Sequence, residues 1–236
     1  MSWLKRLTGG KKVEPKRSEP PREAAKPDLR AIEAAHRRNT EARVAAYEEL
    51  FGCTAKKAFP YHELAIVQDE PFMIDVFVFD LATERFGDVD VTVTNGMSDQ
   101  RMVDPEDHSS WGRRELIQYL PTCTRDHAQR LHRMAWAPLD EGFFLDTCHT
   151  MAWRRAAVEG TPWTSAFFLQ PLLRSHQDFE VDIDGDPVSL LWHIPISEAE
   201  REFKVQHGAN ALIDRMDAVD LPWVVDEANR PSLLPQ

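Results

Sequence analysis

Three short apolar runs in the middle of the chain limit the folds that it can adopt. Residues Met73–Phe79 are mostly apolar on both faces of an extended strand, as in a strand at the centre of a sheet. Residues Val89–Thr94 alternate apolar and polar side chains, and Glu115–Leu120 is a third run that Pro121 ends. Together these runs predict a sheet in the centre of the molecule.

Helical patterns lie at both ends of the chain and between the strands. Pro27–Phe51 and Asp126–Trp136 carry apolar residues at helical spacing. Ser197 is expected to cap a last helix, because Glu200 follows it at the spacing of a capping box. The buried end of that helix is expected to carry three apolar side chains: Leu212, Ile213 and Met216.

Two further segments add strands to the predicted sheet. Ser165–Leu173 is strand-like, and Glu180–Ile196 is typical of a hairpin that turns at Asp184-Gly185. Strands and helices do not alternate regularly, as they would in a βαβ fold. The sequence therefore predicts an α+β fold, with a single domain over residues 28–232 and a mixed, largely antiparallel sheet flanked by helices.

The first 27 residues differ in composition from the rest of the chain. They carry eight Lys/Arg against three Glu, a net charge of +5, which leaves −16 for the remainder because the whole chain has −11. Residues 8–27 show no apolar pattern, so residues 1–27 are expected to form a disordered, basic, Pro/Lys-rich tail and linker. The acidic remainder repels nucleic acid phosphates, and it either suits a basic protein partner or simply keeps the protein in solution.

Nothing in the sequence predicts a membrane span or a secretory signal. The chain has no run of about 18 apolar residues, and its start, MSWLKRLTGGKK, has no apolar region long enough for a signal. Residues 1–7 place Trp and Leu beside Lys and Arg, so they are either a weak membrane-surface or partner-docking peptide or an untethered tail. The odd, widely spaced cysteines Cys53, Cys123 and Cys148 do not suit a disulfide framework, and we expect a cytoplasmic protein.

The stretch TVTNGMSDQRM, residues 92–102, contains a candidate for a catalytic serine, Ser98. Gly96-Met97-Ser98 begins like a nucleophile elbow, but the elbow needs a glycine two residues after the serine, where Gln100 stands. Asn95 and Gly96 tolerate unusual backbone angles, so a strand that ends in a tight turn is the better interpretation. No catalytic residue is predicted here.

The spacing of the candidate metal and cofactor ligands does not match that of known sites. His127 and His132 lie five residues apart, and Cys123 and Cys148 do not form closely spaced zinc-ligand pairs. Asp182–Asp186 resembles a calcium loop, but its glycine is fourth instead of sixth, which favours a hairpin turn. Phosphate-binding glycine motifs are missing from the sequence. We therefore expect no metal and no cofactor.

Several of these segments occur in an order that is specific to one family. In chain order they are Ile74–Phe79, Thr94–Asp99, Arg114–Pro121, Phe144 with Cys148-His149-Thr150, Leu191–Glu200, His207–Leu212 and Asn229–Ser232. The set resembles the suppressor of fused domain family over about residues 45–232. The family has Gly-Met-Ser-Asp where this chain has Gly96–Asp99, and commonly Gly-His-Thr where it has Cys148-His149-Thr150. The motif residues expected to form a structural turn are Asn95, Gly96, Met97, Ser98 and Asp99.

The resemblance implies a function in protein binding. The family is not known as enzymes, and its animal member, a negative regulator of Hedgehog signalling, clamps a short peptide of Gli transcription factors as an added strand between two domains. This chain resembles the first domain only. Bacterial single-domain members resemble immunity proteins, which implies a protein that neutralises a partner toxin, plausibly a basic one. Two alternatives stay open: a regulatory adaptor tethered through the basic N-terminal peptide, and a hydrolase that uses Cys148 and His149.

The resemblance also implies where a partner would bind. In the animal member the peptide lies against a helix and the loop that follows it. Carried over by spacing from the shared histidine, His149, the contacting positions are Trp136, Phe144 and Cys148. The animal member has an acidic residue where this chain has Cys148. Aromatic residues dominate binding hot spots, although Trp136 and Phe144 could equally be core residues.

Overall fold

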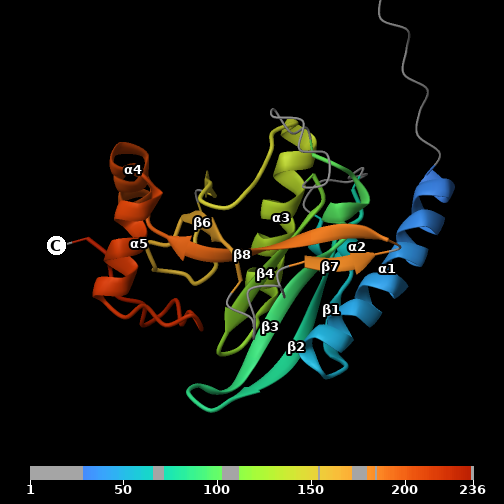
Figure 1. Cartoon of the computed structure of the whole chain (residues 1–236), viewed down its shortest axis with the longest axis horizontal. Coiled ribbons are helices and arrows are strands. Elements are labelled where there is room, and N and C mark those ends of the chain that lie inside the picture. Colours follow the sequence, from blue (N-terminus) through green and yellow to red (C-terminus); the bar gives the residue numbers. More distant parts are fainter. Residues whose placement is uncertain are drawn as a thin grey trace, which may run out of the picture.

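A mixed sheet of eight strands forms the centre of the molecule in the computed structural model of the chain (Figure 1). The structure describes residues 29–65, 72–102, 112–153, 155–171, 180–183 and 185–234, so the predicted tail, residues 1–27, and its peptide 1–7 lie outside the described residues. The strands are β1 (Ala55–Phe59), β2 (Asp75–Thr83), β3 (Gly87–Asn95), β4 (Arg114–Leu120), β5 (Thr150–Ala152), β6 (Ser165–Leu169), β7 (Glu180–Ile183) and β8 (Asp186–Ile196).

Within the described residues, five α-helices and one 3₁₀ turn accompany the sheet. They are α1 (Leu29–Phe51), α2 (Tyr61–Leu64), α3 (Arg125–Glu141), α4 (Glu198–His207), α5 (Ala209–Ala218) and the turn η1 (Met97–Asp99). Figure 1 shows α1 at one end of the molecule and α4 with α5 at the opposite end. No helix in the described ranges combines the length and the apolar character that a membrane crossing needs.

The strand order of the sheet is β1-β2-β3-β4-β8-β6-β5, and β7 pairs with β8 beside this path. All neighbours run antiparallel except β4 and β8, which are parallel. The predicted α+β class with a mixed, largely antiparallel sheet is therefore confirmed. The hairpin β7–β8 pairs Ile183 with Asp186 across the predicted turn, where Gly185 has a φ of 77°.

Two apolar cores cover the two faces of the sheet. On one face, Tyr47 and Phe51 of α1 pack with Val91 of β3 and with the apolar side of β8. On the other face, Leu131 and Met134 of α3 pack with residues of β2 and β4. The alternation of side chains along a strand separates the cores, because successive residues of β2 point to opposite faces.

The prediction of a single last helix is wrong. The segment is two helices, α4 and α5, which meet at Gly208, where φ is 90°. Glycine adopts this backbone angle without the strain that a Cβ causes, so the helical pattern continues in sequence although the helix does not. The predicted capping box is confirmed: Ser197 Oγ accepts from Glu200 N at 3.2 Å, and Ser197 N donates to Glu200 Oε2 at 2.8 Å.

Two other predicted boundaries are wrong. The middle helix runs from Arg125 to Glu141 and contains Pro138, whereas the sequence pattern ended it at Trp136. Its end is set by Gly142, with φ of 70°, whose N–H donates to the Pro138 carbonyl. The predicted strand from Ser165 ends at Leu169 instead of Leu173, and residues 172–173 lie outside the described part.

The end of the chain forms what we call the C-terminal strap, residues 223–234. Glu227 of the strap pairs with Arg130 of α3, and Arg230 lies 3.2 Å from Glu200. Leu233 N also donates to Glu200, at 2.7 Å. The strap therefore joins α3 to the first turn of α4.

Candidate functional site

The turn that follows β3 is built around a buried carboxylate, Glu115 of β4. Glu115 Oε1 accepts hydrogen bonds from Gly96 N and Ser98 N, both at 2.9 Å, and from Ser98 Oγ at 2.6 Å. Its other oxygen accepts from Thr94 Oγ1 at 2.7 Å. Since Glu115 is fully buried, these donors offset the cost of removing its carboxylate from water.

Gly96 is required at this turn for two reasons. Its φ is 134°, in a region that side chains rarely adopt, and a Cβ at this position would lie 2.0 Å from the Met73 carbonyl oxygen. The backbone of the turn therefore passes directly against the segment that leads into β2. This close approach orients the N–H groups of the turn toward Glu115.

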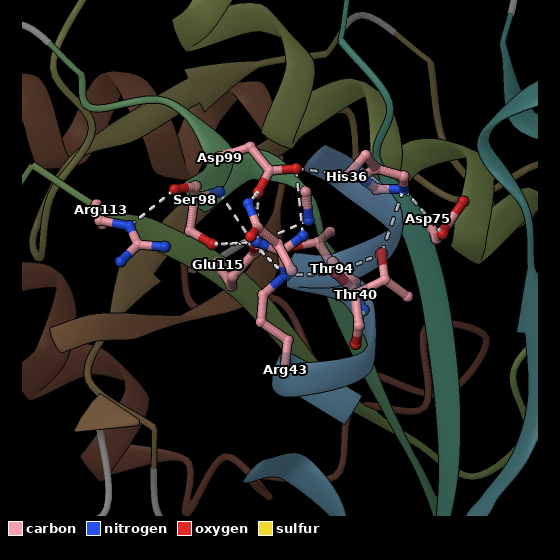
Figure 2. A network of polar contacts seen from close by, with 12 residues as sticks. His36, Thr40, Arg43, Asp75, Thr94, Ser98, Asp99, Arg113 and Glu115 are labelled. Atoms are coloured by element: carbon pink, nitrogen blue, oxygen red, sulfur yellow. Dashed lines mark hydrogen bonds and ion pairs between the residues drawn. The ribbon is translucent and has the colours of Figure 1, made fainter. Parts of the chain in front are cut away.

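Helix α1 inserts a buried arginine into the same turn. Arg43, with no exposed side-chain surface, donates from Nε to Asn95 Oδ1 at 2.5 Å. Its two terminal nitrogens donate to the two oxygens of Asp99 at 2.6 and 3.2 Å, and one of them reaches Ser98 Oγ at 3.2 Å. Figure 2 shows Arg43, Ser98, Asp99 and Glu115 converging in one polar network, which fixes α1 on the turn.

His36, two turns earlier in α1, bridges two carboxylates. Its Nδ1 lies 3.0 Å from Asp99 Oδ2 and its Nε2 3.2 Å from Asp75 Oδ2, as Figure 2 shows. Burial favours the neutral ring, but the hydrogen bonds and charges of Asp75 and Asp99 outweigh it and raise the pKa of His36 to about 9. His36 is therefore an imidazolium at neutral pH, and neither ring nitrogen is available as a base.

Asp99 shows the reciprocal effect. Burial works to raise the pKa of its carboxyl, but hydrogen bonds from His36, Arg43 and Asn39 hold that pKa well below its usual range. The side chain keeps 21% of its surface exposed. In this network Ser98 Oγ donates to Glu115 and accepts from Arg43, so its hydroxyl is held in place by a carboxylate and a cation.

Two surface hollows flank this network. One, of about 360 Å³, is lined by Glu33, His36, Arg37, Thr40, Pro60, Tyr61, His62, Met73 and Asp75. The other, of about 320 Å³, is lined by Asn39, Ser98, Asp99, Arg101, Arg113, Ile183 and Asp186. In the second hollow Asp186 pairs with Arg101 at 2.6 Å and Arg113 at 3.0 Å. Each hollow thus carries charges of both signs and has no single strong polarity.

The predicted partner residues Trp136 and Phe144 lie on the α3 face of the sheet. Trp136 packs edge to face against Phe72, with ring centroids 6.5 Å apart, and under the guanidinium of Arg133. Phe144 lies under the guanidinium of Arg114, 5.4 Å from its ring centroid. Both rings are half-buried against the α3 core, so each also keeps some surface in solvent.

Cys148 and His149 form a bulge where the chain enters β5. Cys148 N donates to the Phe168 carbonyl, and Phe168 N donates to the His149 carbonyl, so two residues lie opposite one. His149 N also closes a turn on the Asp146 carbonyl at 3.1 Å. The φ of Cys148 is 67°, and bulges of this type usually have glycine there. This explains the Gly-His-Thr that the family commonly shows.

The structure brings these four predicted residues together only in part. Asp146 accepts from Arg114 at 3.3 Å, and its N–H donates to His149 Nδ1 at 3.2 Å, which links the Phe144 loop to His149. Cys148 packs against the α1 core, on the opposite side from Trp136 and Phe144. None of these four residues lines either hollow beside the polar network.

Replacing Cys148 tests the strain of this bulge. We expect the Cys148→Gly variant to be more stable than Cys148→Ala by about 1 kcal/mol, because only the alanine keeps a Cβ at positive φ. Both variants lose the thiol, so the comparison isolates the backbone. The measurement is urea denaturation of the two variants side by side. An alanine variant as stable as the glycine variant would show that the bulge is unstrained.

The charge state of His36 predicts a loss of stability in alkali. Its folded pKa is raised to about 9 from 6.5, so its contribution is complete below pH 6.5 and is lost as pH rises through 9. We expect roughly 3 kcal/mol to disappear over this window. Denaturation curves from pH 6 to 10 would measure it. The His36→Gln variant should lack this step, whereas a variant of exposed His62, His62→Gln, should retain it.

Sequence reasoning missed the residues that hold the turn. His36 and Arg43 occupy one face of α1, seven residues apart, but the prediction of this helix considered only its apolar residues. Glu115 stands inside a strand whose other residues are mostly apolar, where an ionised residue needs a partner. These charges at core positions were the signal that could have found the network.

The segments that resemble metal sites in the sequence form other structures. Within the described ranges, no group of three or more His, Cys, Asp or Glu side chains is placed to hold a metal ion. The calcium-like segment forms the β7–β8 hairpin, where Gly185 N donates to Asp182 Oδ1 at 2.7 Å. The cysteines Cys53, Cys123 and Cys148 are free thiols.

A family model matches most of the described chain. It is the model of the suppressor of fused protein, and it covers residues 70–231. The match includes the turn after β3, the bulge before β5 and most of the strap. Curated protein sequences give no significant match to the chain.

Solved structures share the fold at low sequence identity. A suppressor of fused homologue from Neisseria gonorrhoeae matches with a TM-score of 0.64 and 19% identity, over 85% of this chain and 99% of the homologue. A chain of the Sufu–Fu complex matches with 0.61 and 11%, over 83% and 92%. Drosophila Suppressor of Fused matches with 0.62 and 11%, over 82% of this chain and 50% of the Drosophila chain. The described fold is therefore equivalent to about half of the Drosophila protein.

Proposed function

Because the chain belongs to the suppressor of fused protein family, we propose that it is a non-enzymatic domain that binds another protein. The Sufu–Fu complex, in which a structural relative of this chain was solved, supports a function in protein association. The polar network does not present a catalytic base and nucleophile. Both nitrogens of His36 contact carboxylates, and Ser98 is held between Arg43 and Glu115.

The two ends of the sheet differ in how open they are to an added strand. At one end, β1 exposes Lys56 and Lys57 and has an irregular register between Ala55 and Lys57. Charged lysines and bulges are the devices by which proteins prevent pairing at an edge strand. The β1 edge is therefore protected against a partner strand.

At the other end, β5 carries no charged side chain, and the bulge at Cys148-His149 lies before the strand instead of within it. Its residues Thr150, Met151 and Ala152 are uncharged, and β6 is its one partner among the described strands. An uncharged edge strand can accept a peptide through main-chain hydrogen bonds. This contrast between β1 and β5 is the observation that carries the proposal that the partner peptide adds as a strand to β5.

The predicted partner residues suit this location. The exposed His149 directly precedes β5, and Phe144 lies on the loop that leads to it. We propose that Trp136, Phe144, Cys148 and His149 contact the partner, with the half-buried rings of Trp136 and Phe144 supplying apolar contact area. The partner in this proposal is an extended protein segment.

A matched pair of edge variants tests the proposal. Ala152 on β5 and Ala58 on β1 are both exposed, so Ala152→Lys and Ala58→Lys place the same charge on opposite edges. In a pull-down of products of the neighbouring genes co-expressed with the tagged full chain, we expect Ala152→Lys to weaken capture at least tenfold and Ala58→Lys to leave it unchanged. Equal effects on both edges would contradict strand addition at β5, and capture of no protein would contradict the protein-binding function.

The biological purpose that we propose is neutralisation of a toxin in the cytoplasm. The acidic balance of the chain outside its first 27 residues, a net −16, supports this proposal, because it complements a basic toxin domain. The free thiols are compatible with a reducing compartment. Expression of the neighbouring gene product with and without this chain provides the measurement. Cell growth should be restored by the wild-type chain, and failure of rescue despite binding would exclude the immunity role alone.

A further inference from the structure

The middle of the C-terminal strap, residues 226–232, is held in place mainly by polar contacts. Its two buried side chains are Glu227 and Arg230, and its other side chains are at least partly exposed. Glu227 accepts from both terminal nitrogens of Arg130 in α3, and Arg230 Nη1 lies 3.2 Å from Glu200 Oε1 in α4. Buried apolar residues flank this segment on both sides. A change of charge beneath the segment can therefore release it while both of its ends stay anchored.

Trp163 lies directly against this segment. Its Nε1 donates to the Glu227 carbonyl oxygen at 2.6 Å, and the guanidinium of Arg230 lies 4.2 Å from the centroid of its ring. The indole is itself buried. Its N–H therefore reports whether the segment is closed.

Two buried histidines lie next to the pair of Glu227 and Arg130. His127 of α3 places Nε2 3.6 Å from Glu227 Oε1. His193 of β8 adjoins Gln118 of β4, because the residues that precede them are paired in the sheet. Gln118 Nε2 in turn lies 3.5 Å from Glu227 Oε1. The cluster thus joins α3, the sheet and the strap around one carboxylate.

Both histidines are neutral at neutral pH while the segment is closed. Burial lowers the pKa of His193, and the nearby charge of Arg130 lowers it further. Burial also lowers the pKa of His127, and the charge of Glu227 acts in the opposite direction without reversing the shift. With both rings neutral, the charges of Arg130 and Glu227 balance each other.

The other charged groups near the cluster are exposed or already paired. Asp126 belongs to the exposed first turn of α3, and Arg230 is paired with Glu200 of α4. Gln118, which β4 contributes, carries no charge. Protonation of both histidines would therefore place three cations around the single buried carboxylate of Glu227.

The sign of the pH dependence follows from the form that binds protons more tightly. In the closed segment the pKa of each histidine lies below its ordinary value of 6.5, and contact with water after opening lets it rise toward that value. Protons therefore favour the open segment. The contribution of the neutral rings to closure is complete above about pH 6.5 and is lost as pH falls below that value.

We propose that residues 226–232 form an acid-sensitive latch, which opens from α3 when His127 and His193 take up protons. The opening is local, because the segment contains no strand or helix and its apolar anchors stay in place. It brings Arg130 and Glu227 into water, where neither charge needs the other. The contact between the strap and α3 thus depends on pH.

Hydrogen exchange of the wild-type full chain tests the latch. We expect the protection of the Trp163 indole N–H, corrected for the intrinsic effect of pH on exchange, to fall about tenfold or more from pH 7 to pH 5, because each unit of pKa difference is a tenfold change in the opening equilibrium. At pH 5 this N–H should be about tenfold or more less protected than the amides of β3. Its rate should not respond to low urea, because a local opening exposes little surface. Constant protection of Trp163, or protection equal to that of β3, would overturn the proposal.

The His127→Gln variant separates titration from structure. Thr124 N donates to His127 Nδ1 in the capping box, and glutamine at this position can accept the same bond, so the variant keeps the helix start and removes one titrating group. The acid-induced fall in Trp163 protection should become at least threefold smaller. His62→Gln, exposed on α2, should keep the wild-type fall. Equal falls in His127→Gln and wild type would overturn the proposal.

The wild-type protein decides the matter if His127→Gln does not fold. An NMR titration of its histidine rings is expected to place the midpoint of His127 or His193 at the pH at which the Trp163 indole opens to exchange. Rings that take up protons while Trp163 stays protected would contradict the latch.

Discussion

Replacing Gly96 with alanine is expected to lower the free energy of unfolding by about 3 kcal/mol or more. A Cβ at this position would lie 2.0 Å from the Met73 carbonyl oxygen and 3.1 Å from the His36 ring, and φ is 134°. The first contact is with backbone, which cannot rotate away as a side chain can. The turn must therefore move, and its N–H groups lose their alignment with Glu115.

Urea denaturation of Gly96→Ala measures this loss, and Gly142 provides the control. Gly142 ends α3 with φ of 70°, but a Cβ there would meet nothing within 4 Å. Gly142→Ala should therefore lose only the cost of positive φ, about 1 kcal/mol. If the two variants lose the same amount, the close approach to Met73 is not what makes glycine necessary at position 96.

Replacing Arg43 with methionine is expected to lower the free energy of unfolding by about 3–5 kcal/mol. The change keeps most of the side-chain volume but removes the donor to Asn95, two of the hydrogen bonds to Asp99 and the positive charge 3.9 Å from the fully buried Glu115. The penalty comes from the charges that stay buried. A matched variant on the exposed side of the same helix, Arg38→Met, should change stability by less than about 0.5 kcal/mol.

A second substitution separates charge from packing at Arg43. If the excess negative charge left by the loss of Arg43 causes the destabilisation, adding Asp99→Asn to Arg43→Met should recover part of it, because the double variant has one carboxylate fewer in the network. Urea denaturation of the four proteins of this cycle gives the coupling energy. Strictly additive losses would mean that Arg43 acts through packing of α1 and that its charge is unimportant.

The sequence predicted those features well that depend on interactions between residues close together in the chain. The capping box of Ser197 and Glu200 and the glycine of the β7–β8 hairpin act within a few residues, and both are present in the structure. Boundaries were less reliable. The helix predicted to continue through Gly208 ends there, whereas α3 continues through Pro138. Glycine and proline permit a helix to end, but tertiary packing decides whether it does.

The candidate site was predicted only in part, because its residues come from distant positions. Ser98, Asp99 and Glu115 belong to segments of the family pattern, but their partner Arg43 lies outside it. The pattern also did not show that these segments meet. The four predicted partner positions were identified by resemblance alone: Trp136, Phe144, Cys148 and His149. The structure adds the reason why glycine is common at the position of Cys148, namely a positive φ in a bulge.

The sequence by itself determined the type of each main element, the α+β class and, through the order of its motifs, the family. These depend on periodicity and on local backbone preferences, which neighbouring residues set. Only the tertiary structure decided which charges meet. Arg43 and Asp99 are 56 residues apart, and Arg130 and Glu227 are 97 apart. Such pairs form only after the sheet register and the packing of α1, α3 and the strap bring them together, and no local pattern encodes that geometry.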